Sequence, residues 1–216
     1  MMALLPVWAV VPVKETRDAK QRLATALSQA HRSTLALAML EDVLAALVGT
    51  HDLAGILVVT VDDAVRRLAQ RFGAQISEDA ACEGHTAAVM GAARRLAPQG
   101  HAMLTIPGDV PLATSAEIEC MIDAYRRGSR FTIVPARDEQ GSNAILAAPA
   151  DAVPLRFGED SFFPHLAAAR ACGIDPAVLP LPGIGLDIDT PDDLAAFLAR
   201  PVLTRARALL DTAGAV

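Results

Sequence analysis

Three aspartates stand where a carboxylate could hold a metal ion or a substrate. Asp109 follows a short apolar run, and Asp187 and Asp189 lie two positions apart near the end of the chain. In an extended segment alternate side chains share a face, so Asp187 and Asp189 can both turn toward one cation while Leu186 and Ile188 pack on the other side. Mg²⁺ prefers such oxygen ligands. For Asp109 the alternative is an aspartate that only caps a turn.

A second group of candidate residues is basic and follows the apolar run at 7–13. The segment 14–23 carries the cations Lys14, Arg17, Lys20 and Arg22. The loop after the first strand of an open α/β sheet faces the ligand crevice, so this segment is a candidate phosphate-binding loop. The alternative is a basic loop that is merely solvated. The chain has neither a GxxxxGK[ST] nor a GxGxxG pattern, which argues against a P-loop and a dinucleotide site.

Hydroxyl groups on two further segments could bind a small anion. Ser142 and Asn143 lie where a hairpin is expected to turn back, so they could donate to a substrate or only shape the turn. Gly158 and Ser161 precede a helix expected at 162–172, whose free N–H groups favour an anion. Ser161 as an ordinary N-cap is the alternative.

The histidines receive no catalytic role. His165 lies one turn into the helix at 162–172, too far along to serve as the base for Ser161, so a nucleophilic role for Ser161 is rejected. His85, between Gly84 and Thr86 at the start of another helix, is expected on the surface, although a Gly-x-Thr there can present N–H groups to a nucleotide.

Apolar runs and amphipathic stripes alternate along the chain and predict the scaffold for these residues. Strands are expected at 7–13, 56–61, 75–78, 103–106, 131–135 and 144–148, and helices at 28–48, 62–72, 87–96, 118–125, 162–172, 191–198 and 201–213. Asp62, Thr114 and Thr190 are expected as N-caps, and Gly49 as a helix end. The pattern predicts one α/β domain over residues 1–216, with a mostly parallel sheet and a hairpin at its ligand edge.

Composition excludes several classes of partner. The 216 residues are 52% hydrophobic and only 4% aromatic, which suits an aliphatic core, and the net charge of -6 argues against a nucleic-acid binder. Three cysteines without a CxxC pair indicate neither disulfides nor structural zinc, so a reducing cytoplasm is expected. No apolar run reaches the ~20 residues of a membrane span. The apolar start lacks a basic region and a cleavage site, so no secretory leader is expected.

Several motifs, taken in chain order, resemble one known family. They are Val11-Pro12-Val13-Lys14, Ala19-Lys20-Gln21-Arg22-Leu23, Gly108-Asp109-Val110-Pro111, Gly141-Ser142-Asn143-Ala144, Phe157-Gly158 with Ser161 and His165, and the run from Leu186 to Leu194. Together they resemble the 2-phospho-L-lactate or phosphoenolpyruvate guanylyltransferases of coenzyme F-420 biosynthesis, over nearly the whole chain. The resemblance implies a Rossmann-like three-layer sandwich, the GT-A type nucleotidyltransferase fold. It also implies transfer of GMP from GTP to the phosphate of a three-carbon acid (2-phospho-L-lactate, 3-phospho-D-glycerate or phosphoenolpyruvate), with release of pyrophosphate.

The resemblance also implies roles for individual residues. The magnesium ligands would be Asp109, Asp187 and Asp189. The phosphorylated acid would be held by Ser142, Gly158 and Ser161. The triphosphate would lie against the basic residues Lys14, Lys20 and Arg22.

This chain departs from the family pattern at three places. Ser142 stands where the family usually has Thr, Glu159-Asp160 replaces a small neutral pair, and Gly84-His85-Thr86 replaces a Gly-Leu-Asn-like loop. Competing readings are a molybdopterin or sugar nucleotidyltransferase, a glycosyltransferase whose Asp-x-Asp is 187–189, and a non-catalytic nucleotide-binding module. The sequence does not fix the oligomeric state, and a homodimer is one state that it allows.

Overall fold

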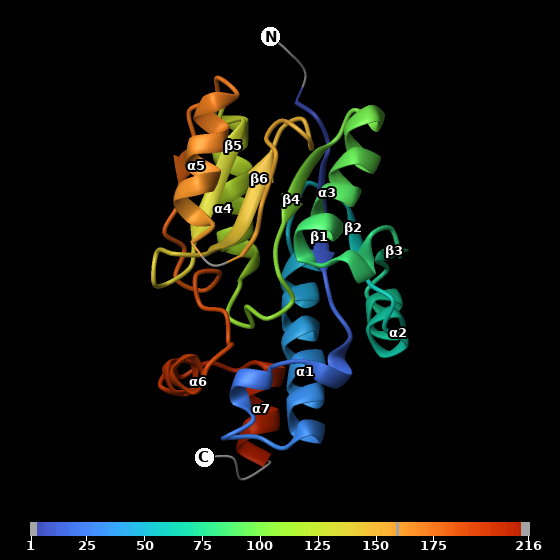
Figure 1. The fold of residues 1–216 in the computed structure, drawn as a ribbon, viewed down its shortest axis with the longest axis vertical. Helices are drawn as coiled ribbons and strands as arrows, with labels where there is room; N and C mark the ends of the chain where they lie inside the picture. Colours follow the sequence, from blue (N-terminus) through green and yellow to red (C-terminus); the bar gives the residue numbers. More distant parts are fainter. Residues whose placement is uncertain (1–3, 159, 213–216) are drawn as a thin grey trace.

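A twisted seven-stranded sheet organises the chain, as a computed structural model describes it for residues 4–158 and 160–212 (Figure 1). The strand order is β3-β2-β1-β4-β6-β5-β7, and β6 alone among these strands runs antiparallel to its neighbours. The strands are β1 (Val7–Pro12), β2 (Leu53–Val59), β3 (Gln75–Ser77), β4 (Ala102–Thr105), β5 (Phe131–Pro135), β6 (Ser142–Ala147) and β7 (Ala177–Val178).

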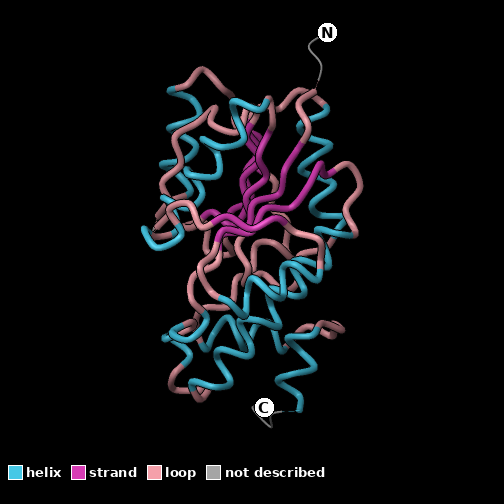
Figure 2. The backbone as a smooth tube through the Cα atoms, turned by 90° about the vertical axis from the view of Figure 1, so that its right-hand side faces the viewer, coloured by secondary structure: helices cyan, strands magenta, loops and turns pink. Residues whose placement is uncertain are grey.

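Helices cover both faces of the sheet. Figure 2 shows the strands in the centre, with helices on either side. Helices α1, α2 and α4 contribute to the core on one face, and α3 and α5 to the core on the other. The helices are α1 (Gln29–Val48), α2 (Asp63–Arg71), α3 (His85–Leu96), α4 (Ser115–Arg126), α5 (Phe162–Ala171), α6 (Pro191–Leu198) and α7 (Arg205–Thr212). Short 3-10 turns lie at Thr16–Asp18, Gln21–Leu23, Ala81–Glu83 and Ala97–Gln99. The predicted three-layer α/β sandwich is confirmed.

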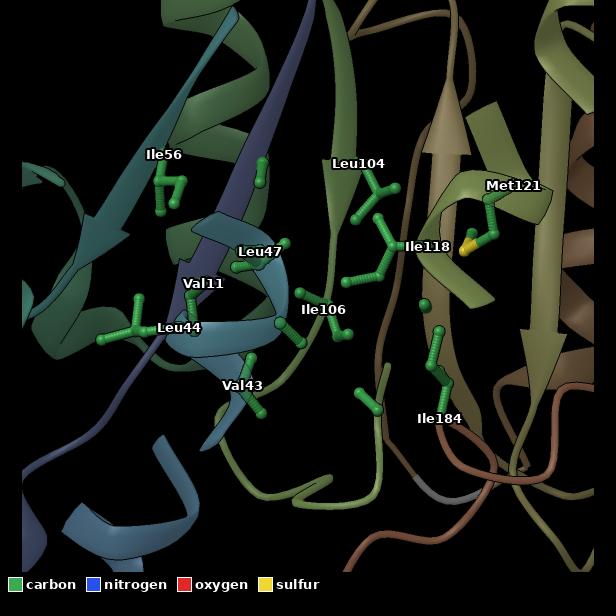
Figure 3. Close-up of a cluster of buried hydrophobic side chains, with 14 of the residues drawn as sticks. Val11, Val43, Leu44, Leu47, Ile56, Leu104, Ile106, Ile118, Met121 and Ile184 are labelled. Atoms are coloured by element: carbon green, nitrogen blue, oxygen red, sulfur yellow. The ribbon is translucent and has the colours of Figure 1, made fainter. Parts of the chain in front are cut away.

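Strand β1 shows why the central runs are apolar throughout. Ala9 and Val11 belong to the core on one face, and Val10 belongs to the core on the other. Side chains alternate along a strand, so a strand covered on both faces needs apolar residues at every position. Figure 3 shows the first of these cores, where Val11 lies among side chains of α1 and the neighbouring strands.

A third apolar cluster lies beyond the carboxyl ends of the parallel strands. It joins Leu35 and Met39 of α1 to residues of α6 and α7, and it includes Leu186 and Ile188. Figure 1 shows α7 beside α1, with α6 beyond α7. The Asp42 carboxylate of α1 accepts the N–H groups of Arg205 and Ala206 and so caps α7. The prediction of a helix from residue 201 is therefore wrong at its start, because α7 begins only at the residue that Asp42 caps. Residue 213, its predicted end, lies outside the described residues.

Local signals for helix ends are confirmed. The side chains of Asp62 and Thr114 accept N–H groups at the starts of α2 and α4, and Gly49 is the C-cap of α1. Thr190 and Asp193 form a capping box with Pro191 in the first turn of α6. The predicted start of the hairpin's second strand is wrong, because β6 already includes Ser142 and Asn143. Of the described helices, none combines the length and the apolar character needed to cross a membrane.

Candidate functional site

The three aspartates of the sequence analysis gather at the carboxyl edge of the sheet. The backbone N–H of Ile188 donates to the carbonyl oxygen of Asp109 at 3.1 Å, which holds the 187–189 segment beside the end of β4. Leu186 and Ile188 are buried, whereas Asp187 and Asp189 are partly exposed, so the predicted alternation is confirmed. The aspartates thus reach one crevice from two distant parts of the chain.

Lys20 supplies the positive charge inside this cluster. Its Nζ lies 2.5 Å from Asp109 Oδ2 and 2.5 Å from Asp189 Oδ1, and its side chain is 7% exposed. Burial alone would lower the pKa of Lys20, but the two carboxylates outweigh burial and raise that pKa above its ordinary value. Lys20 also adopts a left-handed backbone conformation, with φ 56°, which is uncommon for a residue other than glycine.

The carboxylates retain binding capacity that the protein does not use. Asp109 Oδ1 is buried without a hydrogen-bond partner. The Asn143 amide donates to Asp187 Oδ1 at 3.1 Å and to the carbonyl of Ile184 at 2.9 Å, so its Nδ2 hydrogens are used within the protein, although Asn143 also lines the second cavity. Burial, with repulsion from Asp109 and Asp189, raises the pKa of Asp187. A hard cation would give Asp109 Oδ1 a partner and would reduce the repulsion between Asp187 and the two other aspartates.

The arrangement does not by itself form a three-ligand metal centre. Within residues 4–158 and 160–212, no group of three or more His, Cys, Asp or Glu side chains is arranged to hold a metal ion. One or two carboxylates suffice for Mg²⁺, which takes its other ligands from water and substrate phosphates. Joint ligation by all three aspartates stays a prediction.

Two adjoining cavities meet at this cluster. The first, of about 720 Å³, is lined mainly by residues of 12–20, 81–85 and 107–109. The second, of about 890 Å³, is lined mainly by residues of 83–86, 136–143, 157–161 and 186–193. Their shared lining is Lys14, Gly84, His85, Pro107, Asp109 and Asp189. A ligand in one cavity would therefore meet a ligand in the other beside two carboxylates and an exposed ammonium.

A chain of hydrogen bonds lines the second cavity. Ser161 Oγ accepts the backbone N–H of Ser142 at 3.1 Å and lies 3.4 Å from Ser142 Oγ. His165 Nδ1 lies 2.9 Å from the same Ser142 oxygen. The Ser161 side chain makes no capping bond to α5, although Ser161 is the N-cap residue. Its hydroxyl therefore belongs to the cavity wall rather than to the helix end.

A row of edge-to-face aromatic contacts runs from His85, which lines both cavities, through Phe157 to the buried His165. The ring centroids of His85 and Phe157 are 4.6 Å apart, and those of Phe157 and His165 are 5.0 Å apart. Thr86 Oγ1 accepts the backbone N–H of Phe157 at 2.9 Å. His85, expected on the surface, is half-buried against Phe157 and lines both cavities. Burial lowers the pKa of His85, against the opposing effect of the Asp109 carboxylate. The Thr86 side chain thus ties the loop at Phe157 to the start of α3, and contact of the Gly-x-Thr N–H groups with a nucleotide stays a prediction.

All nine predicted site residues line one or both cavities. Lys14, Asp109 and Asp189 line both, Lys20 lines the first, and the second is lined by Arg22, Ser142, Gly158, Ser161 and Asp187. Gly158 has φ 151°, which favours glycine for conformational reasons, since a Cβ there would meet no atom within 4 Å. Glu159 lies outside the described residues.

Sequence reasoning missed some of the wall. Arg137 and Thr105 line the second cavity, and Thr86 holds its rim. Arg137 lies two positions after Pro135, the end of β5, so its position after a strand was a usable signal. Thr86 and His165 belong to motifs that the sequence shows, but their contacts could not be predicted, because their partners come from segments far away in sequence.

Comparison with known proteins identifies the family of this chain. The family model described as "Guanylyl transferase CofC like" matches residues 7–214. A phosphoenolpyruvate guanylyltransferase of Conexibacter woesei is 36% identical, over 88% of this chain and 86% of its own length. A 3-phospho-D-glycerate guanylyltransferase of Colwellia psychrerythraea is 34% identical, over 94% and 98%. A 2-phospho-L-lactate guanylyltransferase of Methanothermobacter thermautotrophicus is 33% identical, over 94% and 88%.

The fold has counterparts among solved structures. The structure of a putative nucleotide-diphospho-sugar transferase from Desulfovibrio desulfuricans superposes with a TM-score of 0.80, covering 98% of this chain and 96% of that one, at 17% sequence identity. The likeness supports the nucleotidyltransferase fold that the motifs implied. On the family match and the identity to three curated relatives, this chain belongs to the CofC-like guanylyltransferases and is a nucleotidyltransferase.

Proposed function

We propose that this protein transfers GMP from GTP to the phosphate of a three-carbon phosphorylated acid in coenzyme F-420 biosynthesis. An oxygen of the acceptor phosphate attacks the α-phosphorus of GTP, the bond to the β-phosphate oxygen breaks, and pyrophosphate leaves. The observation that carries the proposal is the meeting of two cavities at Lys14, Asp109 and Asp189. The names of the relatives supply guanylyl transfer and the acid class.

We assign GTP to the first cavity and the acid to the second. Lys14 and Lys20 line the first, where cations favour a triphosphate. Ser142 and Ser161 line the second, where hydroxyl and backbone N–H groups favour a small anion with carboxylate and phosphate oxygens. The attacking atom belongs to the acid, so no protein nucleophile is needed.

The chemistry calls for a hard divalent cation, which we propose to be Mg²⁺. Asp109, Asp187 and Asp189 would hold it, and it would neutralise charge that builds up as the nucleotidyl group moves. Lys20 already binds Asp109 and Asp189 as a cation. Lys14 lines both cavities, so its ammonium could bind phosphate oxygens of the donor and of the acceptor.

The test is direct turnover with defined substrates. The purified protein, GTP and Mg²⁺ are incubated with each of the three acids, and pyrophosphate release is measured with a downstream enzyme present to trap an unstable product. Acid-dependent pyrophosphate release and a guanylylated acid by mass spectrometry are expected. Turnover of sugar phosphates with none of the acids, or no nucleotide consumption at all, would overturn the proposal.

Two further proposals concern the setting of the reaction. The three cysteines are exposed and unpaired, which suits a reducing cytoplasm as the location. A homodimer stays a prediction, which the mass in solution by light scattering would decide.

A further inference from the structure

His165 is buried, at 1% exposure, and is hydrogen-bonded at both ring nitrogens. Nε2 accepts the backbone N–H of Arg156 at 2.9 Å. A backbone N–H can only donate, so Nε2 carries no proton and the ring proton resides on Nδ1. Burial lowers the pKa of His165 to about 4, which agrees with a neutral ring.

The tautomer sets the direction of the next hydrogen bond. Nδ1–H donates to Ser142 Oγ at 2.9 Å, and the Ser161 hydroxyl donates to the same oxygen at 3.4 Å. Ser142 Oγ has two acceptor sites, and these neighbours use both. The hydroxyl proton of Ser142 is left to point away from His165 and Ser161, and Ser142 lines the second cavity.

We propose that His165 is a positioning residue, which holds the Ser142 hydroxyl as a donor to an anionic oxygen of the acid. The inference rests on the proposed function, because it takes the second cavity as the acid site. His165 itself does not line the cavity, and it acts on the substrate only through Ser142. Without it, the Ser142 hydroxyl could turn its proton toward its neighbours and present lone pairs to the anion.

Two substitutions separate this role from simple packing. In His165→Asn the amide N–H can take the place of Nδ1–H and still donate to Ser142. In His165→Gln the amide reaches the place of Nε2, so its carbonyl can accept from Arg156 but the donation to Ser142 is lost. We expect the KM for the acid to stay within about threefold in His165→Asn and to rise about tenfold or more in His165→Gln. The KM for GTP should not change in either variant.

A double substitution tests whether the effect passes through Ser142. When Ser142→Ala is already present, adding His165→Gln should raise the acid KM no further. If each substitution instead raises the acid KM by its own factor, and the double variant shows the product of the two factors, the inference is contradicted. Thermal unfolding of each variant controls for loss of the fold.

Long-range ¹H–¹⁵N correlation spectra of the wild-type protein, labelled at histidine, report the tautomer without any need for turnover. A proton on Nδ1 is expected, and a proton on Nε2 would overturn the inference. No transfer by the wild type to any of the acids would overturn the proposed function, and with it the role of Ser142. An active wild type with equal acid KM values in His165→Asn and His165→Gln would overturn this inference alone.

Discussion

At the scale of single residues, the carboxylate of Asp109 has one oxygen available for a cation. One of its oxygens binds Lys20 and the other is buried without a partner. Replacement of Asp109, Asp187 or Asp189 by Asn keeps the shape of the side chain and removes its charge. We expect each change to slow GMP transfer by about 10²-fold or more while the fold remains intact. Steady-state kinetics measure the loss.

The control is a similar change outside the cavities. Asp151 is exposed and lines neither cavity, so Asp151→Asn should behave like the wild type. Wild-type kcat in the Asp187 or Asp189 variant would remove that residue from the proposed metal site.

His165 makes stability depend on pH. Its pKa is about 4 in the folded protein, against about 6.5 in an unfolded chain. Between pH 6.5 and pH 4 His165 is mostly protonated in the unfolded chain and mostly neutral in the folded protein, so acid favours unfolding. The free energy of unfolding should fall by about 3 kcal/mol through this residue as the pH drops from 6.5 to 4. Urea titrations across this range measure the fall.

The comparison variant is His165→Asn, which cannot titrate. Its unfolding free energy should change less over the same pH range than that of the wild type. Parallel pH profiles for the two proteins would contradict a buried neutral histidine.

The site residues that the sequence predicted depend on local rules. The spacing of Asp187 and Asp189 fixes their common face in any extended segment, and Asp109 follows a recognisable strand. His165 and Asn143 could not be assigned in this way. Each has partners more than eight residues away along the chain, and only the fold brings them together.

At the scale of elements, the basic loop after β1 joins the carboxylates to the first cavity. Lys20 contacts Asp109 and Asp189, while Arg17 of the same loop lines neither cavity. Lys20→Ala should raise the KM for GTP or slow transfer about tenfold or more, with little change in the KM for the acid. Kinetics with each substrate varied in turn measure the two constants.

Arg17→Ala removes a cation from the same loop and should leave both KM values near those of the wild type. A Lys20→Ala enzyme that loses affinity for the acid but not for GTP would move this loop to the acceptor side of the site.

Element boundaries were predictable where one residue decides them. Asp62, Thr114 and Thr190 accept N–H groups within their own first turns, so each cap is made without a distant partner. The start of α7 was missed although Thr204, just before it, accepts the N–H of Arg207. Its other cap, Asp42 of α1, could not be predicted, because only the fold brings it there. The two-residue strand β7 was missed, because so short a segment cannot show an alternation of apolar and polar residues.

At the scale of the whole molecule, Asp42 fastens the end of the chain to its first helix. Asp42→Ala removes two of the hydrogen bonds that cap α7 and should cost about 1 kcal/mol of unfolding free energy, or a few degrees of Tm, with kcat unchanged. Calorimetry measures the shift. Glu41→Ala, which loses only the ion pairs of Glu41 with Arg71 and Arg205, should cost less. Equal losses in the two variants would show that the cap contributes nothing of its own.

The lining of the two cavities divides the chain in sequence as well as in space. Apart from Asp189, the first cavity is built by residues 12–109, whereas the residues special to the second come mostly from 136–193. Substitutions in the later segment can therefore accumulate while most of the first cavity, which we propose binds GTP, stays unchanged. The three relatives share guanylyl transfer in their names and differ in the acid. With the two linings separate, specificity for the acid can change during evolution while specificity for the nucleotide is kept.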